Sequence, residues 1–275
     1  MFLRNRFVII QEEEKKINKL LNLIGLFLIM NNTVELVEKY ISAFRGLINS
    51  KIWPSKNSIR KTLRLSKDED WSFLCVSMDI VEDACTAINN FLMFGLNGPT
   101  KLEDIGEKYL RLYGILSATY IQQEALLKLY QIVNVPPSFK GGKELVDNLL
   151  IRSLRHKLSS HGTNYLNKVS NSIEACVPIR FDLDDFNCTY AINGRGNHNS
   201  VDLKESVNDH LNTMVELLDR ILGKALKTLF KGQETSKNYI EFSEKLADLR
   251  IIRKGGIVLQ PPNGRKLIIT MTSEI

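Results

Sequence analysis

Cysteine is scarce in this sequence, and its spacing is uninformative for metal binding. Cys75, Cys85, Cys176 and Cys188 form no CxxC pair and do not cluster with the four histidines. This spacing argues against a zinc site and against a disulfide scaffold, which both need closely grouped or regularly spaced cysteines. We therefore expect a reducing, cytoplasmic setting.

Several short enzyme motifs are also missing. The sequence has no GxxxxGK[ST] phosphate loop, no HExxH zinc motif, no GxSxG nucleophile elbow and no DxDxDG calcium loop. The acidic run FDLDDF at 181–186 falls at the tip of an expected hairpin, where acids are usually solvated. The sequence therefore predicts no metal site.

Apolar runs are too short to cross a bilayer. The run LLNLIGLFLIM at 20–30 is strongly apolar, but a membrane-spanning helix needs about 20 residues. The start, MFLRNRFVII, is followed at once by QEEEKK without a small-residue cleavage site, so it is a poor signal peptide. We expect a buried or partner-facing helix at 20–30 and no stable membrane span, with an interfacial anchor as the alternative.

The composition is that of an ordinary globular protein with a mild basic surplus. Hydrophobic residues make up 44% and charged residues 25% of the chain. Lys and Arg total 37 against 31 Asp and Glu, which gives a formal charge of +6. This surplus favours polyanionic partners such as RNA or DNA, although many proteins are this basic without binding either.

Helical periodicity dominates the chain and predicts a mainly α protein, an antiparallel helical bundle with small β-hairpin additions. Thr100 is the expected cap of the second long helix. β-branched and aromatic residues predict a hairpin over 175–194, followed by a polar loop at 194–200, and a terminal hairpin over 255–271. Helices are expected over 33–50, 71–95, 101–133, 143–158, 201–230 and 238–252.

These elements divide the chain into three expected parts. Residues 1–66 form an N-terminal helical extension, and residues 67–232 form the main bundle with the hairpin insertion near 175–194. Residues 233–275 supply a C-terminal helix and hairpin.

One short stretch gathers chemistry-bearing residues: LRHKLSSHGTNY at 154–165 holds two of the four histidines beside basic residues. Metal-free RNA cleavage needs a base for the ribose 2′-hydroxyl proton and cations for the phosphate, and His and Arg supply both. Nothing in the stretch demands a cofactor. On a straight α-helix, Arg155 and His161 are separated by about 120° and about 9 Å. Their convergence therefore needs the helix to bend or end at 159–162, where Gly162 can adopt a left-handed conformation, or needs a second chain.

A structural interpretation of the same stretch is simpler. Basic residues in a last helical turn complement the helix dipole, and His161 then only caps the helix. His198 and His210 are expected to be bystanders.

The stretch resembles the signature of the HEPN family, the all-helical domains found in RNA-cleaving toxins and antiviral defence systems. That signature is an arginine followed by a polar residue and, after a short gap, a histidine, which Arg155, His156 and His161 match. Two long helices also precede the motif helix, as in the family. The resemblance covers about residues 70–230.

The resemblance implies a metal-independent endoribonuclease that works as a homodimer without a cofactor, with an antitoxin or another defence protein as a possible partner. Arg155 then binds phosphate, His161 is the catalytic histidine and His156 is the polar residue beside the arginine. Lys157, Ser160 and Tyr165 are expected to contact RNA, and Glu82 or Asp83 is the expected supporting acid, unless these two are only solvated charges. Some family members have lost catalysis, so the alternative is a non-catalytic module that binds a partner protein or a nucleotide.

Overall fold

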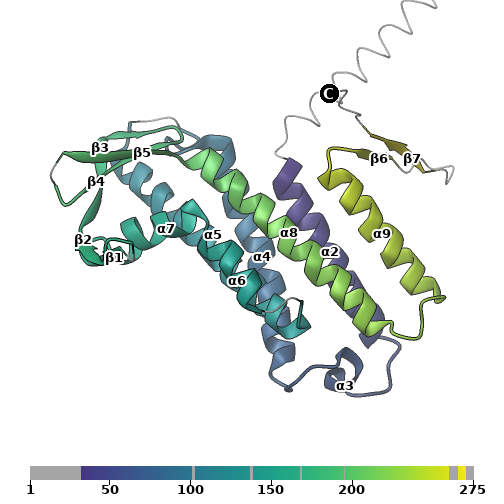
Figure 1. Ribbon diagram of the computed structural model, residues 1–275. Coiled ribbons are helices and arrows are strands. Elements are labelled where there is room, and N and C mark those ends of the chain that lie inside the picture. Colours follow the sequence, from purple (N-terminus) through teal and green to yellow (C-terminus); the bar gives the residue numbers. More distant parts are fainter. Residues whose placement is uncertain are drawn as a thin grey trace, which may run out of the picture.

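The computed structural model describes residues 32–100, 103–136, 139–167, 169–194, 196–259 and 266–270, which form a mainly α protein with small antiparallel sheets (Figure 1). The helices are α2 Asn32–Ile52, α3 Ile59–Leu63, α4 Asp70–Phe94, α5 Ile105–Val133, α6 Phe139–Asp147, α7 Leu150–Leu154, the π-helix η1 Arg155–Ser160, α8 Leu203–Leu229 and α9 Lys237–Arg253. The strands are β1 Tyr165–Asn167, β2 Ser172–Glu174, β3 Cys176–Asp184, β4 Asn187–Ile192, β5 Asn197–Asp202, β6 Ile257–Leu259 and β7 Leu267–Ile269.

The long helices α2, α4, α5 and α8 pack against one another around the main hydrophobic core (Figure 1). Large side chains fill it, including Tyr40 and Phe44 of α2 and Leu116 and Tyr130 of α5, none of which is exposed to solvent. Burial of one such side chain stabilises the fold by about 1.5–3 kcal/mol. The periodic pattern expected along α4 is confirmed, because residues 74, 78, 81, 85, 88 and 92 are all buried.

The core does not stop at the boundaries expected from the sequence. In the predicted extension over 1–66, α2 packs on α4 and α8 and contributes side chains to the main core. In the predicted C-terminal part over 233–275, α9 packs along α2 and α8 and buries Phe242 in the same core. All three expected parts, as far as they are described, therefore contribute to one core.

The long helices α5 and α8 each begin at an aspartate whose side chain caps the helix. Thr100 is not the cap of α5: the side chain of Asp104 accepts hydrogen bonds from the amides of Gly106 and Glu107, at 2.8 and 3.4 Å. Asp202 caps α8 in the same way: its side chain accepts hydrogen bonds from the amides of Lys204 and Glu205. An acceptor at this position satisfies amides that have no partner within the helix.

The predicted hairpin over 175–194 is confirmed as β3 and β4, with a register irregularity in the middle of β3. The predicted polar loop at 194–200 is wrong in part, because β5 pairs with β4 from Asn197 to Asp202 and makes β4 the central strand. The side chains of β5 are mostly polar, so the sequence shows no alternation of apolar residues there.

The acidic turn between β3 and β4 docks the sheet on the helices. Asp184 accepts a hydrogen bond from the side-chain amide of Asn97 at 2.9 Å and lies 3.5 Å from the ammonium of Lys108. These contacts, with the Asn97 hydrogen bond first, lower the pKa of Asp184. Phe186 packs edge-on against Phe91 of α4, with ring centroids 5.7 Å apart. Asp184 and Phe186 thus attach the sheet to the helices.

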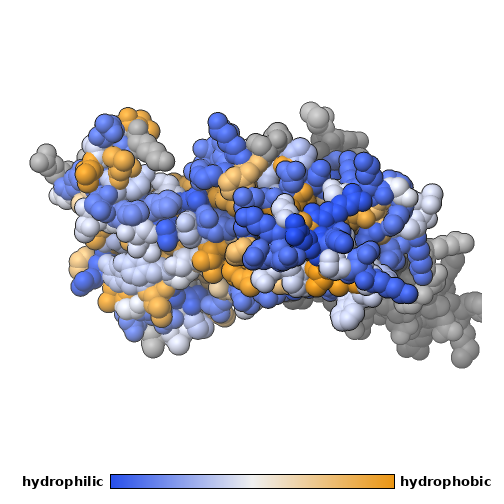
Figure 2. Space-filling model, turned by 90° about the horizontal axis from the view of Figure 1, so that it is seen from below, coloured by the Kyte–Doolittle hydropathy of each residue, from blue (hydrophilic) through white to orange (hydrophobic). Residues whose placement is uncertain are grey.

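The surface has no single dominant apolar face in the view of Figure 2, where hydrophilic residues predominate and apolar residues form separate patches. Within the described residues, no helix combines the length and the apolar character needed to cross a membrane. The apolar run at 20–30 lies outside the described residues.

Candidate functional site

The motif helix is interrupted twice, where the sequence predicts one continuous helix over 143–158. α6 ends at Asp147, Leu149 is extended, and α7 is followed directly by η1. In η1 the hydrogen bonds join residues five apart, and the His161 amide donates to the His156 carbonyl oxygen at 2.9 Å. Such π-helical turns are rare and frequently lie at functional sites. The helix therefore ends after Ser160, inside the stretch expected from the sequence.

This turn sets two imidazole rings side by side. In a regular α-helix, residues five apart point about 140° away from each other. In η1 the rings of His156 and His161 are nearly parallel, 19° apart in plane, with centroids separated by 6.2 Å. His161 and Ser160 are exposed, and His156 is half-buried. Both imidazoles are thus presented together at the end of the motif helix.

Arg155 is held by an aromatic ring and not by an acid. Its guanidinium carbon lies 3.9 Å from the ring centroid of Tyr120 on α5, and the ring of His156 meets the same tyrosine edge-on at 5.9 Å. Among the described residues, no carboxylate pairs with Arg155, and no hydrogen bond or ring contact joins Arg155 directly to His161. The two are linked only through Tyr120 and His156. A cation–π contact leaves the guanidinium N–H groups free for another acceptor.

Arg152, one helical turn earlier, has the opposite environment. Only 8% of it is exposed, and it donates to Gln123 at 3.0 Å and to Glu124 at 2.8 Å. Its Nε also lies 3.1 Å from a carboxylate oxygen of Asp147, and its guanidinium carbon lies 4.9 Å from the ring centroid of Tyr120. Arg152 therefore fastens α6, α7 and α5 together, and its donors are used.

His210 of α8 ends this buried network. Gln122 donates to the Val81 carbonyl, so its oxygen faces His210 Nε2, at 2.8 Å. Gln123 accepts from Arg152, so its amide nitrogen faces His210 Nδ1, at 3.2 Å. These roles define a neutral imidazole protonated on Nε2. Complete burial lowers the pKa of His210 to about 3, in agreement with that state.

The pKa of His156 is also lowered, by burial first and then by the nearby charges of Arg152 and Arg155 and by His161. Desolvation and neighbouring cations both disfavour an imidazolium. His156 is thus neutral near pH 7 and able to accept a proton.

The end of the motif is fastened to the sheet. The Gly162 carbonyl accepts a hydrogen bond from the Cys176 amide at 2.6 Å, and a Cβ on this glycine would lie 3.1 Å from the Cys176 oxygen. Gly162 does not have the left-handed conformation expected from the sequence; close approach is its structural role. Lys157 lies over Tyr165 and Tyr190, at 5.4 and 5.7 Å from the ring centroids.

The two expected acids lie elsewhere. Glu82 on α4 pairs with Arg45 of α2, at 2.9 Å, and Arg45 also pairs with Asp79. Asp83 is exposed on α4. Among the described residues, neither acid makes a hydrogen bond or ion pair with the motif. The structure therefore places Arg155, His156, His161 and Lys157 on one segment without the acids.

The described residues contain no cluster of three or more His, Cys, Asp or Glu side chains suited to a metal ion. The cysteines are unpaired thiols, and burial raises the pKa of both Cys85 and Cys188 to about 12.

Sequence reasoning missed Tyr120 and the role of His210. Tyr120 is 35 positions before Arg155, and nothing local links them. A signal for His210 was present: it lies on the apolar stripe of α8 between Val207 and Met214, where an unpartnered polar group is costly.

No protein-family model, curated protein or solved structure matches the chain.

Proposed function

We propose that this protein is a metal-independent endoribonuclease of the HEPN kind, with an antiparallel bundle as its core and Arg155, His156 and His161 as its reactive groups. The observation that carries the proposal is the π-helical turn. It holds two imidazoles 6.2 Å apart at the surface, beside an arginine that has no acidic partner among the described residues. A purely structural role requires neither the exposure of His161 nor the unused donors of Arg155.

The proposed reaction needs only these groups. His156, neutral near pH 7, takes the proton of a ribose 2′-hydroxyl, and the 2′-oxygen attacks the adjacent phosphorus. Arg155 binds the non-bridging oxygens as negative charge builds on them. The bond to the 5′-oxygen breaks, and His161 donates a proton to that leaving oxygen. The products are a 2′,3′-cyclic phosphate and a 5′-hydroxyl.

RNA beyond the reacting phosphate is expected to lie along Lys157, Ser160 and Tyr165. Lys157 adds positive charge next to the motif, and the half-buried ring of Tyr165 is available for stacking against a base.

A homodimer is part of the proposal, because no hydrogen bond or ring contact joins Arg155 to His161 within one chain and a second copy can complete the phosphate site. The strands that follow the motif offer a surface for that copy. Leu166 and Ile173 face each other across β1 and β2, and they are 52% and 69% exposed. Exposed apolar pairs of this kind favour association.

The cellular role proposed from the resemblance is that of a toxin or antiviral-defence effector in a reducing cytoplasm, held in check by an antitoxin or another protein of the same system. The unpaired cysteines of the described residues suit that setting.

The test is cleavage of total RNA and tRNA by the purified protein in the presence of a metal chelator. His161→Ala should slow cleavage by about 100-fold or more, the usual contribution of general acid–base catalysis. His198→Ala is the matched control, because His198 is also exposed but lies on β5. Cleavage by all three proteins at one rate, or loss of cleavage with the chelator, contradicts the proposal. No cleavage by any of them favours the non-catalytic binding module.

A further inference from the structure

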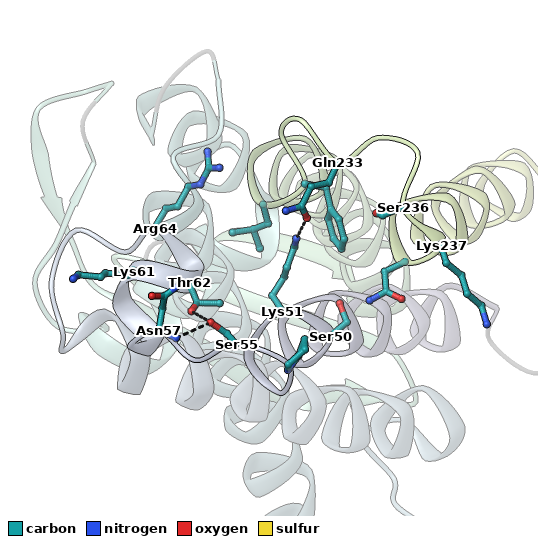
Figure 3. A pocket seen from close by; sticks show the side chains of 14 residues that line it. Ser50, Lys51, Ser55, Asn57, Lys61, Thr62, Arg64, Gln233, Ser236 and Lys237 are labelled. Atoms are coloured by element: carbon teal, nitrogen blue, oxygen red, sulfur yellow. Dashed lines mark hydrogen bonds between the residues drawn. The ribbon is translucent and has the colours of Figure 1, made fainter.

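A second basic site lies at the end of the molecule formed by α3, the C-terminus of α2 and the connection from α8 to α9 (Figures 1 and 3). These segments line an open pocket of about 580 Å³. Pockets for small ligands have volumes of about 300–1,000 Å³. The motif residues are not among its lining residues, so the pocket is separate from the proposed cleavage site.

The charge of the pocket is of one sign. Its described lining contains Lys51, Lys61, Arg64 and Lys237 and no aspartate or glutamate. Within the described residues none of these four cations takes part in an ion pair, whereas Arg60 on the same short helix pairs with Asp68 at 3.6 Å. Four cations without a counter-charge around one hollow create a positive potential that attracts anions.

Lys51 stands in the middle of the pocket (Figure 3). Its ammonium donates to the side-chain oxygen of Gln233 at 2.7 Å and lies 3.6 Å from the ring centroid of Phe230. Both partners are neutral, and the side chain is half-buried. Burial first, and then the charge of Arg64, lower the pKa of Lys51, as expected for a cation that lacks an anion.

The rest of the lining is rich in neutral donors. The hydroxyls of Ser55 and Thr62 are 2.7 Å apart, and the backbone amide of Asn57 donates to the Ser55 hydroxyl at 3.1 Å (Figure 3). On the other side Ser236 caps α9 and brings the start of that helix to the pocket. Lys61 and Lys237 extend outward at two sides, and their exposed side chains can turn toward a bound anion (Figure 3).

We propose that this pocket binds a small ligand that carries a chain of phosphates, either a nucleoside triphosphate or an inorganic polyphosphate. The cations are spread around a hollow larger than one phosphate, which suits several linked phosphates. The inference does not depend on the proposed ribonuclease activity.

Arg64 allows binding to be separated from folding. It ends α3 in the left-handed conformation, with φ of 55°. Glycine adopts this conformation without the steric cost that any other side chain has. Arg64→Gly should therefore remove a ligand contact while leaving the thermal unfolding midpoint equal to or above that of the wild type.

The experiment is titration calorimetry of the full chain at low salt with sodium triphosphate, ATP and a single-stranded RNA as separate probes. The matched control is Lys254→Gln, because Lys254 is an exposed lysine at the end of α9 that does not line the pocket. Wild type and this control should bind triphosphate and ATP with one-to-one stoichiometry. Lys51→Gln and Arg64→Gly should each weaken both by about tenfold, the usual effect of losing one charge-assisted contact. Equal affinity for the two probes identifies a phosphate-only site, and tighter ATP binding identifies a nucleotide site.

His161→Ala should bind triphosphate as the wild type does, so this proposal and the ribonuclease proposal fail independently. No binding of either small probe by the wild type overturns the inference. Unchanged affinity in both Lys51→Gln and Arg64→Gly overturns it too. If those variants weaken only RNA binding, the pocket is an RNA-contacting surface instead.

Discussion

Arg152 and Arg155 both contact Tyr120, and the regions around these two arginines differ in what surrounds the positive charge. On the inner side, Arg152 has two carboxylates and a buried amide as partners, and the network continues to the fully buried His210. On the outer side, Arg155 has only the tyrosine face among the described residues, and it is followed by an exposed His161.

The difference shows how one short segment serves both folding and the proposed chemistry. Polar groups that stabilise the fold are paired, because an unpaired buried donor or charge is costly. Groups that bind a ligand keep donors unpaired and exposed until the ligand arrives. By this criterion Arg152 is structural and Arg155 is available for binding, although they are three positions apart.

The largest expected effect separates these two arginines. Arg152→Ala should lower the free energy of unfolding by about 2–4 kcal/mol, because it leaves Gln123 and the rest of the buried network without a donor. Arg155→Ala should lower it by less than about 1 kcal/mol, the value of one cation–π contact. Urea denaturation of both variants measures the difference.

The same pair should behave in the opposite way in RNA cleavage. Arg155→Ala should lose about 100-fold or more in kcat, as expected for a donor to a developing oxyanion, while its unfolding curve stays close to that of the wild type. Equal destabilisation by the two substitutions would show that the guanidinium of Arg155 is also a structural group.

The second effect is a pH dependence of stability from His210. In the unfolded chain this histidine binds a proton near pH 6.5, but in the folded protein only near pH 3. Between these values the unfolded state holds more protons, so stability falls as the pH falls below about 6.5. The contribution between pH 7 and pH 5 is about 2 kcal/mol.

Comparison of urea midpoints at pH 7 and pH 5 tests this effect. His210→Gln should reduce the loss on acidification by about 2 kcal/mol, even if it lowers stability at both pH values. His198→Gln, on the exposed strand β5, is the control and should show the loss of the wild type. An undiminished loss in His210→Gln contradicts the buried neutral imidazole.

Sequence periodicity was sufficient for the long helices and insufficient for the motif helix. α2, α4 and α8 bury apolar residues at helical spacing, which is visible in any window. The apolar spacing also continues through 143–158, yet the chain is extended at Leu149, and Asp147 and Arg152 pair across the break. A π-helical turn has one residue more than an α-helical turn, and no residue type in the sequence predicts where such a turn occurs.

The candidate site was predictable only where its residues are neighbours in sequence. Arg155, His156 and His161 stand in one motif, but their contact with Tyr120 depends on how α5 packs beside α7 and η1. For the same reason, the sequence gives no sign that Glu82, chosen as a supporting acid, is engaged elsewhere. Its ion pair with Arg45 depends on the packing of α2 against α4.

The smallest expected effect concerns Tyr120, the residue shared by both regions. Its ring contacts both Arg155 and Arg152, and its hydroxyl makes no hydrogen bond to another of the described residues. Tyr120→Phe should therefore match the wild type in stability and in RNA cleavage. Tyr120→Leu should lose about 0.5–1 kcal/mol of stability with the cation–π contact.

In cleavage assays Tyr120→Leu should lower kcat severalfold with little change in KM, because the tyrosine orients Arg155 and does not touch RNA in the proposed reaction. A KM effect equal in Tyr120→Phe and Tyr120→Leu would mean that the hydroxyl contacts the RNA. Tyr120 would then belong to the exposed region of Arg155 alone, and the buried network of Arg152 would begin at Gln123.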